Sequence, residues 1–206
     1  EAVRKNNERI RKNKIRRLLI ANFEESDYWV TLTWKKERRV GTLEAAKKQV
    51  QRFLRKIRRF FDKAGEAFKY IGVLERGSKG ALHFHIVMNR IKELDLALTK
   101  WPEGHVNITP TYQEGKFRQL ADYIGKDQEE RWLTRSRNLK EPIVKEKKVK
   151  LKPNWYNKDP KPKKGFEIIK DTIFTGINPV TNKLYMHYAM QKGGSSGKGN
   201  CIYRSS

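Results

Sequence analysis

The sequence predicts an α+β fold, in which helices pack against a mostly antiparallel β-sheet and a basic C-terminal extension follows. Two stretches, 28–34 and 81–89, alternate two kinds of side chain along the chain, as half-buried strands do. A third stretch, 42–64, carries apolar residues at helical spacing. The expected order is strand, helix, strand, strand, helix, strand, helix, and this order favours an antiparallel sheet with helices against it.

The composition limits the classes of function. The 206 residues include 47 Lys and Arg against 23 Asp and Glu, which gives a net charge of +24. For such a chain the most frequent partner is a polyanion, usually nucleic acid. A basic membrane-surface protein is the weaker alternative, because the sequence has no long apolar run. The single cysteine, Cys201, cannot form an internal disulfide, which suits a reducing cytoplasm.

Three regions follow from the pattern along the chain. Residues 1–24 form a basic helix or arm, with eight basic side chains between Arg4 and Arg17. Its charge suits either a solvated face or a contact with DNA. Residues 25–138 carry the predicted core, and residues 139–206 form a lysine-rich linker followed by a β extension, with strands expected over 166–174 and 183–190.

The helix expected over 42–64 has two distinct faces. Thr42 is placed to cap its start and Gly65 stands just beyond its end. One face is apolar, and the other carries eight basic side chains: Lys47, Lys48, Arg52, Arg55, Lys56, Arg58, Arg59 and Lys63. That basic face is equally consistent with binding phosphates and with merely keeping the helix soluble.

A hairpin brings three metal-ligand types together. Residues 70–75 form an apolar run that ends at Glu75, and the turn sequence 76–80 leads into the strand 81–89. Because strand side chains alternate between faces, His83 and His85 project from the same face. Two imidazoles and a nearby carboxylate are able to hold a divalent cation, although a pair of ordinary surface histidines fits the bare pattern equally well.

A second helix follows a further strand. A short helix is expected over 93–101 and a strand over 105–109. Apolar residues then mark a helix after residue 116, on which Tyr123 and Lys126 lie about one turn apart. Tyr112 precedes this helix in a loop and has no lysine three residues on, so it is the weaker candidate nucleophile.

Three motifs together resemble a known superfamily. The strand 28–34, the His-Phe-His sequence at 83–85 with Glu75 ahead of it, and the Tyr-Ile-Gly-Lys sequence at 123–126 are similar in order and spacing to the motifs of HUH-superfamily rolling-circle replication initiators, or Rep endonucleases. The resemblance covers about residues 25–135. A weaker likeness to replication-associated proteins of Gram-positive phages, plasmids and integrative elements continues to residue 139. It implies a fold related to the ferredoxin-like architecture.

The resemblance implies a chemistry for these residues. His83, His85 and Glu75 would hold Mn²⁺ or Mg²⁺ against a scissile phosphate, and Tyr123 would attack that phosphate, with Lys126 as a supporting charge. The product would be a 5′-phosphotyrosine link and a free 3′-OH, from a metal-dependent enzyme that nicks and joins single-stranded DNA to initiate rolling-circle replication. DNA contacts are also expected from five residues near the motifs: Trp29, Thr31, Thr33, Arg76 and Lys79.

The partners follow from the same resemblance. The substrate would be single-stranded DNA at a replication origin, presented as a hairpin or nick site. The glycine-rich tail 193–200 fails the spacing of a phosphate-binding loop, so a host helicase would unwind the duplex and a host polymerase would extend the 3′-OH. The expected protein is a monomer or weak dimer in the cytoplasm of a bacterial host, encoded by a phage or another mobile element and without a membrane partner.

Other functions stay open on the sequence. Within the superfamily, a single-tyrosine transposase or a mobilisation relaxase is the nearest alternative. A non-catalytic nucleic-acid-binding module needs the same charge but has no use for His83, His85 and Tyr123 together. An iron oxygenase with two histidines and one carboxylate has no need of a net charge of +24.

Overall fold

The computed structural model describes residues 2–24, 26–92, 94, 98, 100–111, 117–126, 129–143, 150, 153–178, 181–192 and 202–205. The chain divides into two compact units. The larger unit is Glu8–Ile143, and the smaller unit combines Glu1–Asn7 with Val144–Ser206. The α+β class expected from the sequence is confirmed: the described helices accompany two antiparallel sheets, of five and three strands.

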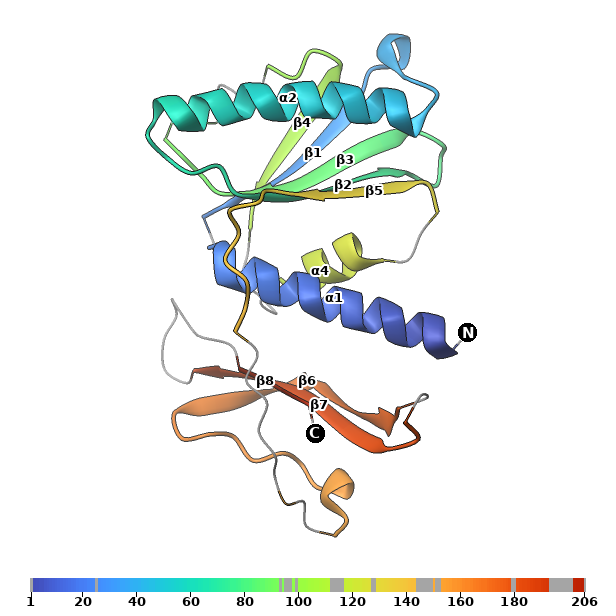
Figure 1. Ribbon diagram of the computed structural model, residues 1–206, viewed down its shortest axis with the longest axis vertical. Coiled ribbons are helices and arrows are strands. Elements are labelled where there is room, and N and C mark those ends of the chain that lie inside the picture. Colours follow the sequence, from blue (N-terminus) through green and yellow to red (C-terminus); the bar gives the residue numbers. More distant parts are fainter. Residues whose placement is uncertain are drawn as a thin grey trace. The chain divides into compact units, whose positions relative to one another are not determined.

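The larger unit is built on a five-stranded antiparallel sheet. Its strands follow the order β4-β1-β3-β2-β5, so the two strands of the histidine hairpin occupy its interior together with β1 (Figure 1). The bounds of the five strands are β1 Tyr28–Trp34, β2 Tyr70–Arg76, β3 Leu82–Met88, β4 Gly104–Pro110 and β5 Arg131–Arg135. Interior strands are held by hydrogen bonds on both edges, which fixes the positions of their side chains.

One face of this sheet is covered by α2, Leu43–Lys63. Thr42 caps the helix, because its hydroxyl accepts a hydrogen bond from the amide of Ala45 over 3.3 Å. Gly65 follows the helix with a φ of 69°, a conformation that glycine adopts without strain. The apolar side of α2 packs on alternate residues of β1 and β3, including Leu32 and Phe84, which are fully buried. Alternation along the strands therefore directs the histidines to the opposite face.

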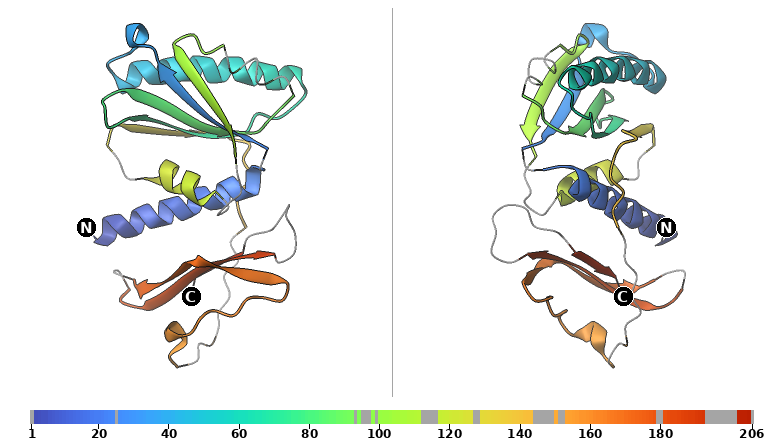
Figure 2. Two further views of the ribbon diagram at one scale, coloured as in Figure 1. Left: turned by 180° about the vertical axis from the view of Figure 1, so that it is seen from behind. Right: turned by 60° about the vertical axis from the view of Figure 1, so that its left-hand side comes forward.

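The opposite face is covered by α1, Ala2–Asn22, and α4, Arg118–Gly125 (Figures 1 and 2). Within the larger unit, Leu18 and Leu19 of α1 are buried together with Ile124 of α4 and with Val73 and Val87 of the sheet. Burial of aliphatic side chains of this size stabilises a fold by roughly 1.5–3 kcal/mol each. The apolar positions of the basic N-terminal segment are thus core positions.

The two helices cross at a glycine. A Cβ atom on Gly125 would lie 2.9 Å from the Cα of Lys12, too close for any side chain to fit without movement. Arg11 of α1 also donates from Nε to the carbonyl oxygen of Gly125 over 2.9 Å. The close approach and the hydrogen bond both fix the C-terminal end of α4 against α1.

The smaller unit contains a three-stranded sheet in the order β6-β7-β8, with bounds Phe166–Ile177, Leu184–Lys192 and Ile202–Ser205, preceded by the short helix η2, Trp155–Asn157. Met186, Tyr188 and Met190 form its small buried cluster. The register shifts between Ile169 and Phe174. There the Thr172 hydroxyl donates to Ile169 O and accepts from Ala189 N, which satisfies backbone groups that the irregular pairing leaves over.

Most expected elements are present, and three differ. Strand β5 was not predicted, nor was β8. The helix expected over 93–101 falls largely on residues outside the described part of the chain, as do Tyr112 and the tail 193–200. None of the helices in the described residues combines the length and apolar character needed to cross a membrane.

Candidate active site

The candidate site lies on the face of the sheet that α1 and α4 cover. Register pairs Glu75 of β2 directly with His83 of β3, and places His85 two residues along on the same face. Tyr123 comes from α4 on the same side of the sheet. Three elements that are separate in the sequence therefore bring a carboxylate, two imidazoles and a phenol to one region.

The hydroxyl of Tyr123 contacts two of these groups. It donates a hydrogen bond to Glu75 Oε1 over 2.5 Å, and its oxygen lies 2.7 Å from His85 Nε2. Glu75 is 6% exposed and His85 is 9% exposed. The phenol is thus held by a buried carboxylate and a buried imidazole, which are the two side-chain types able to accept its proton.

A third residue fixes the tautomer of His85. Since Tyr123 donates to Glu75, its oxygen accepts the N–H of His85 Nε2. In the neutral ring Nδ1 is then an acceptor, and the Thr31 hydroxyl lies 3.0 Å from it. Thr31, His85, Tyr123 and Glu75 accordingly form one chain of hydrogen bonds that all run in the same direction.

Trp29 packs against the same groups. Its ring stacks on the His85 imidazole, with centroids 5.5 Å apart and planes 15° from parallel, and meets the Tyr123 ring edge-on at 5.8 Å. Trp29 and Thr31, expected from the sequence as DNA contacts, are therefore in contact with the residues of the candidate catalytic group. Their described contacts orient His85 and Tyr123.

Arg131 joins the group and was not anticipated from the sequence. Its Nε lies 3.2 Å from Glu75 Oε2, and the two side chains are 10% and 9% exposed. Its Nη2 donates to the carbonyl oxygen of Tyr123 over 2.8 Å, and Nη1 donates to that of Lys126. One guanidinium thus pairs with the carboxylate and caps the end of α4.

Burial sets the charge states at this site. It lowers the pKa of His85 to about 4, mainly because desolvation disfavours the imidazolium, against the opposing effect of the Glu75 carboxylate. Burial and the hydrogen bond to Glu75 raise the pKa of the Tyr123 hydroxyl. At neutral pH His85 is therefore a neutral base and Tyr123 keeps its proton, so the phenol needs a proton acceptor before it acts as a nucleophile.

The donor atoms are of the right type for a divalent cation. Glu75 Oε1 and His85 Nε2 aim at one point, the phenol oxygen, and Glu75 Oε2 is buried without a hydrogen bond although it faces Arg131. The ring of His83 lies 6.1 Å from that of His85. A carboxylate and imidazoles fit Mn²⁺ well and Mg²⁺ acceptably. Among the described residues, no three His, Cys, Asp or Glu side chains are gathered into a metal-ligand group.

The remaining expected residues surround this centre. The Thr33 hydroxyl lies 3.5 Å from the carbonyl oxygen of His105. Arg76 pairs with Glu130 and donates to the carbonyl of Gly80 in the hairpin turn. Lys79 is exposed in that turn, and Lys126 is exposed at the end of α4.

The residues of this centre lie in a segment that matches a known family. Residues 27–128 match the family model of the replication-associated protein ORF2. This part of the chain is similar to replication-associated proteins. The matched segment contains Glu75, His83, His85 and Tyr123, and it supports a role in the initiation of replication, with DNA as the partner. Arg131 and β5 lie beyond the replication-associated match. No curated protein and no solved structure matched the chain.

Proposed function

We propose that this protein is a metal-dependent enzyme that nicks and joins single-stranded DNA to initiate rolling-circle replication, as HUH endonucleases do. The observation that carries the proposal is the position of the Tyr123 hydroxyl, 2.5 Å from Glu75 Oε1 and 2.7 Å from His85 Nε2. A structural tyrosine requires only one such partner. A phenol between a buried carboxylate and a neutral imidazole has what a nucleophile requires, which is a base within hydrogen-bond reach.

In the proposed reaction Tyr123 Oη attacks the phosphorus of a phosphodiester. The phenol gives up its proton to Glu75 or His85, the new bond joins Oη to phosphorus, and the bond from phosphorus to the 3′ oxygen breaks. The leaving oxygen takes up a proton and becomes a free 3′-OH, while the DNA stays attached as a 5′-phosphotyrosine. Reversal of the same step with another 3′-OH joins strands.

Glu75, His83 and His85 would hold a divalent cation, Mn²⁺ or Mg²⁺. When bound, such a cation polarises the phosphate oxygens and lowers the charge barrier to attack. Thr31 and Trp29 keep the His85 ring in position, and Arg131 keeps Glu75 and the end of α4 in position. Lys126, exposed beside the nucleophile, supplies a positive charge for the phosphate.

A single covalent link forms at a time. Ala121 and Asp122 precede Tyr123, so the α4 motif offers one phenol. Two linked events, such as closing a circle, then require a second molecule or release by water.

The direct test is a covalent adduct. The protein is incubated with labelled single-stranded oligonucleotides of random sequence and Mn²⁺, then separated on a denaturing gel. We expect a labelled band at the mass of the protein plus DNA, and its loss when EDTA replaces Mn²⁺. A protein that binds these oligonucleotides but forms no such band under Mn²⁺ or Mg²⁺ would contradict the proposal.

A further inference from the structure

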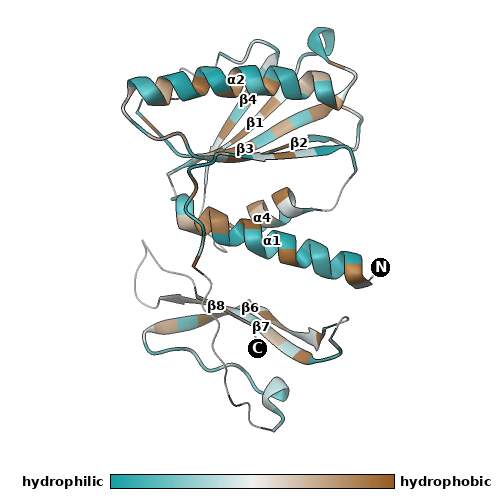
Figure 3. Ribbon diagram, viewed as in Figure 1, coloured by the Kyte–Doolittle hydropathy of each residue, from teal (hydrophilic) through white to brown (hydrophobic). Residues whose placement is uncertain are grey.

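The outer side of α2 carries an unusual row of charge. Seven of its exposed side chains are basic and two, Glu44 and Asp62, are acidic. Five of the basic residues follow one another at spacings of three or four, which places them along one side of the helix: Lys48, Arg52, Arg55, Arg59 and Lys63. The row is about 22 Å long at a rise of about 1.5 Å per residue. Figure 3 shows the hydrophilic character of this helix.

Solubility alone does not explain the row. Within the part of the chain that the structure describes, none of its five members forms an ion pair or a side-chain hydrogen bond. Like charges four residues apart, as in Arg55 with Arg59 and Arg59 with Lys63, destabilise a helix. A helix that needed only to be soluble would alternate its charges. A row of mutually repelling cations instead suits a bound polyanion, which relieves the repulsion.

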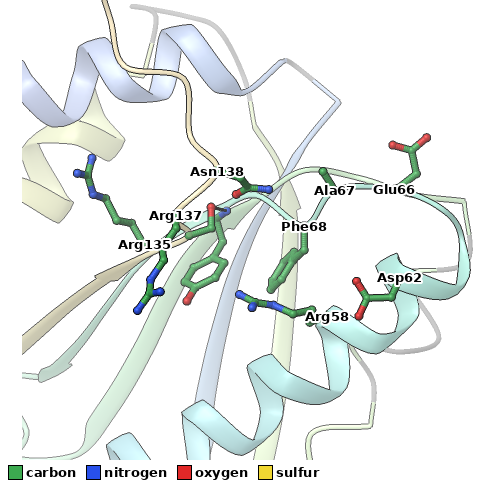
Figure 4. Close-up of a pocket in the computed structure, with 10 residues that line it drawn as sticks. Arg58, Asp62, Glu66, Ala67, Phe68, Arg135, Arg137 and Asn138 are labelled. Atoms are coloured by element: carbon green, nitrogen blue, oxygen red, sulfur yellow. Dashed lines mark hydrogen bonds between the residues drawn. The ribbon is translucent and has the colours of Figure 1, made fainter.

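A cleft of about 630 Å³ opens beside the C-terminal end of this helix (Figure 4). Its arginines come from both walls, Arg58 from α2, and Arg135 and Arg137 from the segment at the end of β5. Arg135 is paired with Glu141. Arg58 and Arg137 are exposed and form no ion pair or side-chain hydrogen bond among the described residues. Two guanidiniums are thus available to a ligand.

The interior of the cleft is preformed. Phe68 and Tyr70, which are stacked and nearly buried, lie at its base. Ser136 fixes Tyr70 through two hydrogen bonds, from Tyr70 N to the Ser136 hydroxyl and from Ser136 N to the Tyr70 carbonyl. A ligand therefore meets a surface that needs no rearrangement, which reduces the cost of binding.

The polar groups of the cleft indicate the ligand class. Arg58 and Arg137 suit a phosphate, while Asp62, Glu66 and the Asn138 amide offer acceptors for the amino groups of a base. The carboxylates disfavour a free phosphate ion, which has no group to satisfy them. The volume is that of a small-molecule site and suits one nucleotide.

We propose that the α2 row and this cleft form a second nucleic-acid surface, which holds an unpaired strand by its phosphates and admits one of its nucleotides. The surface lies on the face of the sheet that α2 covers, whereas Tyr123 lies on the other face. It goes beyond the proposed strand cleavage and does not depend on it.

Salt-dependent binding tests the surface. The probe is a fluorescein-labelled single-stranded oligonucleotide of mixed sequence, followed by anisotropy over a series of NaCl concentrations. Arg55→Gln with Arg59→Gln removes two cations of the row, and Arg58→Gln with Arg137→Gln removes two of the cleft. Each pair should lower the magnitude of the log–log slope by about 1.4, because each phosphate that is no longer neutralised accounts for about 0.7.

The control pair is Lys36→Gln with Arg39→Gln, which removes the same charge from exposed positions before α2. We expect the control to change the slope by less than half as much. Equal changes in all three proteins, or an unchanged slope in both test pairs, would overturn the proposal and leave the row to an acidic protein partner or to bulk charge.

Stability and chemistry separate the remaining explanations. The row pair should keep or raise the thermal midpoint, because repulsion along α2 falls, and a lowered midpoint together with weakened binding would indicate misfolding and count against the surface. Adduct formation at saturating oligonucleotide should match that of the unaltered protein in both test pairs. If no protein forms an adduct, the proposed cleavage fails while the slopes still decide this surface.

Discussion

Arg131 Nη2 donates a hydrogen bond to the carbonyl oxygen of Tyr123 over 2.8 Å, so the residue proposed as nucleophile is held through its backbone as well as its hydroxyl. The same guanidinium lies 3.2 Å from Glu75 Oε2. The two partners of Arg131 are therefore the two ends of the shortest hydrogen bond at the site, between Tyr123 and Glu75.

Arg131→Lys tests this arrangement. A lysine keeps the charge but has no planar fork with which to reach a carboxylate and two carbonyls at once. We expect the rate of adduct formation to fall about 100-fold, the usual effect of a misplacement of about 1 Å, with little change in DNA affinity. The control is Arg135→Lys, whose guanidinium pairs with Glu141 in an exposed position. Similar rates for the two variants would remove Arg131 from the machinery.

Tyr123→Phe removes only the hydroxyl. We expect it to abolish the covalent adduct while binding of single-stranded DNA stays nearly intact, as measured by denaturing gel and by anisotropy. Packing of the ring against Trp29 and His85 is retained, so the fold should also persist. An undiminished adduct would assign the nucleophile to another tyrosine, and Tyr112 would be tested next.

Substitution of the expected ligands tests the metal. His83→Ala and His85→Ala should each eliminate cleavage and weaken Mn²⁺ binding measured by calorimetry, because a site that loses one of three ligands holds a cation poorly. Glu75→Ala should act in the same direction with a smaller effect. Wild-type cleavage by either histidine variant, in buffer stripped with EDTA and resupplied with Mn²⁺, would refute the assignment.

Thr31→Val keeps the shape of the side chain and removes the hydroxyl next to His85 Nδ1. The hydrogen-bond chain at the site requires the Nε2–H tautomer in the metal-free protein, and the ¹⁵N shifts of the His85 ring report it directly. We expect the variant to mix the two tautomers and to slow adduct formation about 10-fold, the lower range for a residue that orients a metal ligand. Unchanged ring shifts would show that Thr31 does not set the tautomer.

Truncation after Ile143 separates affinity from chemistry. The cut leaves the larger unit complete, including Leu139, which is buried, and the two hydrogen bonds between Asn22 and Lys140. Loss of the lysine-rich segment up to Lys164 should flatten the salt dependence of DNA binding, and cleavage of saturating short single strands should persist. An unaltered slope in the folded, shortened protein would mean that the extension does not bind DNA.

The parts of the fold that were predictable are those with a strong local pattern. Alternation gave β1 its bounds, 28–34, and helical spacing with Thr42 and Gly65 gave α2 nearly its full length. The face shared by His83 and His85 also followed from alternation. Each of these depends on neighbours in the sequence, so no distant contact was needed.

Other features depend on contacts that local patterns do not contain. The β5 segment, Arg131–Arg135, has only five residues and pairs at an edge with β2, about 60 positions earlier. Nothing near Arg131 in the sequence indicates that it reaches Glu75, and Thr31 is one of several polar residues on its strand. A basic residue shortly after a candidate nucleophile helix was the one usable signal, since arginine caps helix ends.

The contact between Gly125 and Lys12 has a consequence for the limits of the functional unit. The segment similar to replication-associated proteins, 27–128, contains every side chain proposed to react. It leaves out α1, which touches α4 from one side, and Arg131, which binds the end of α4 from another. A fragment cut to that segment would keep the reactive groups and lose the clamp that aims them. The smallest competent piece of this chain therefore runs from within α1 to the end of β5.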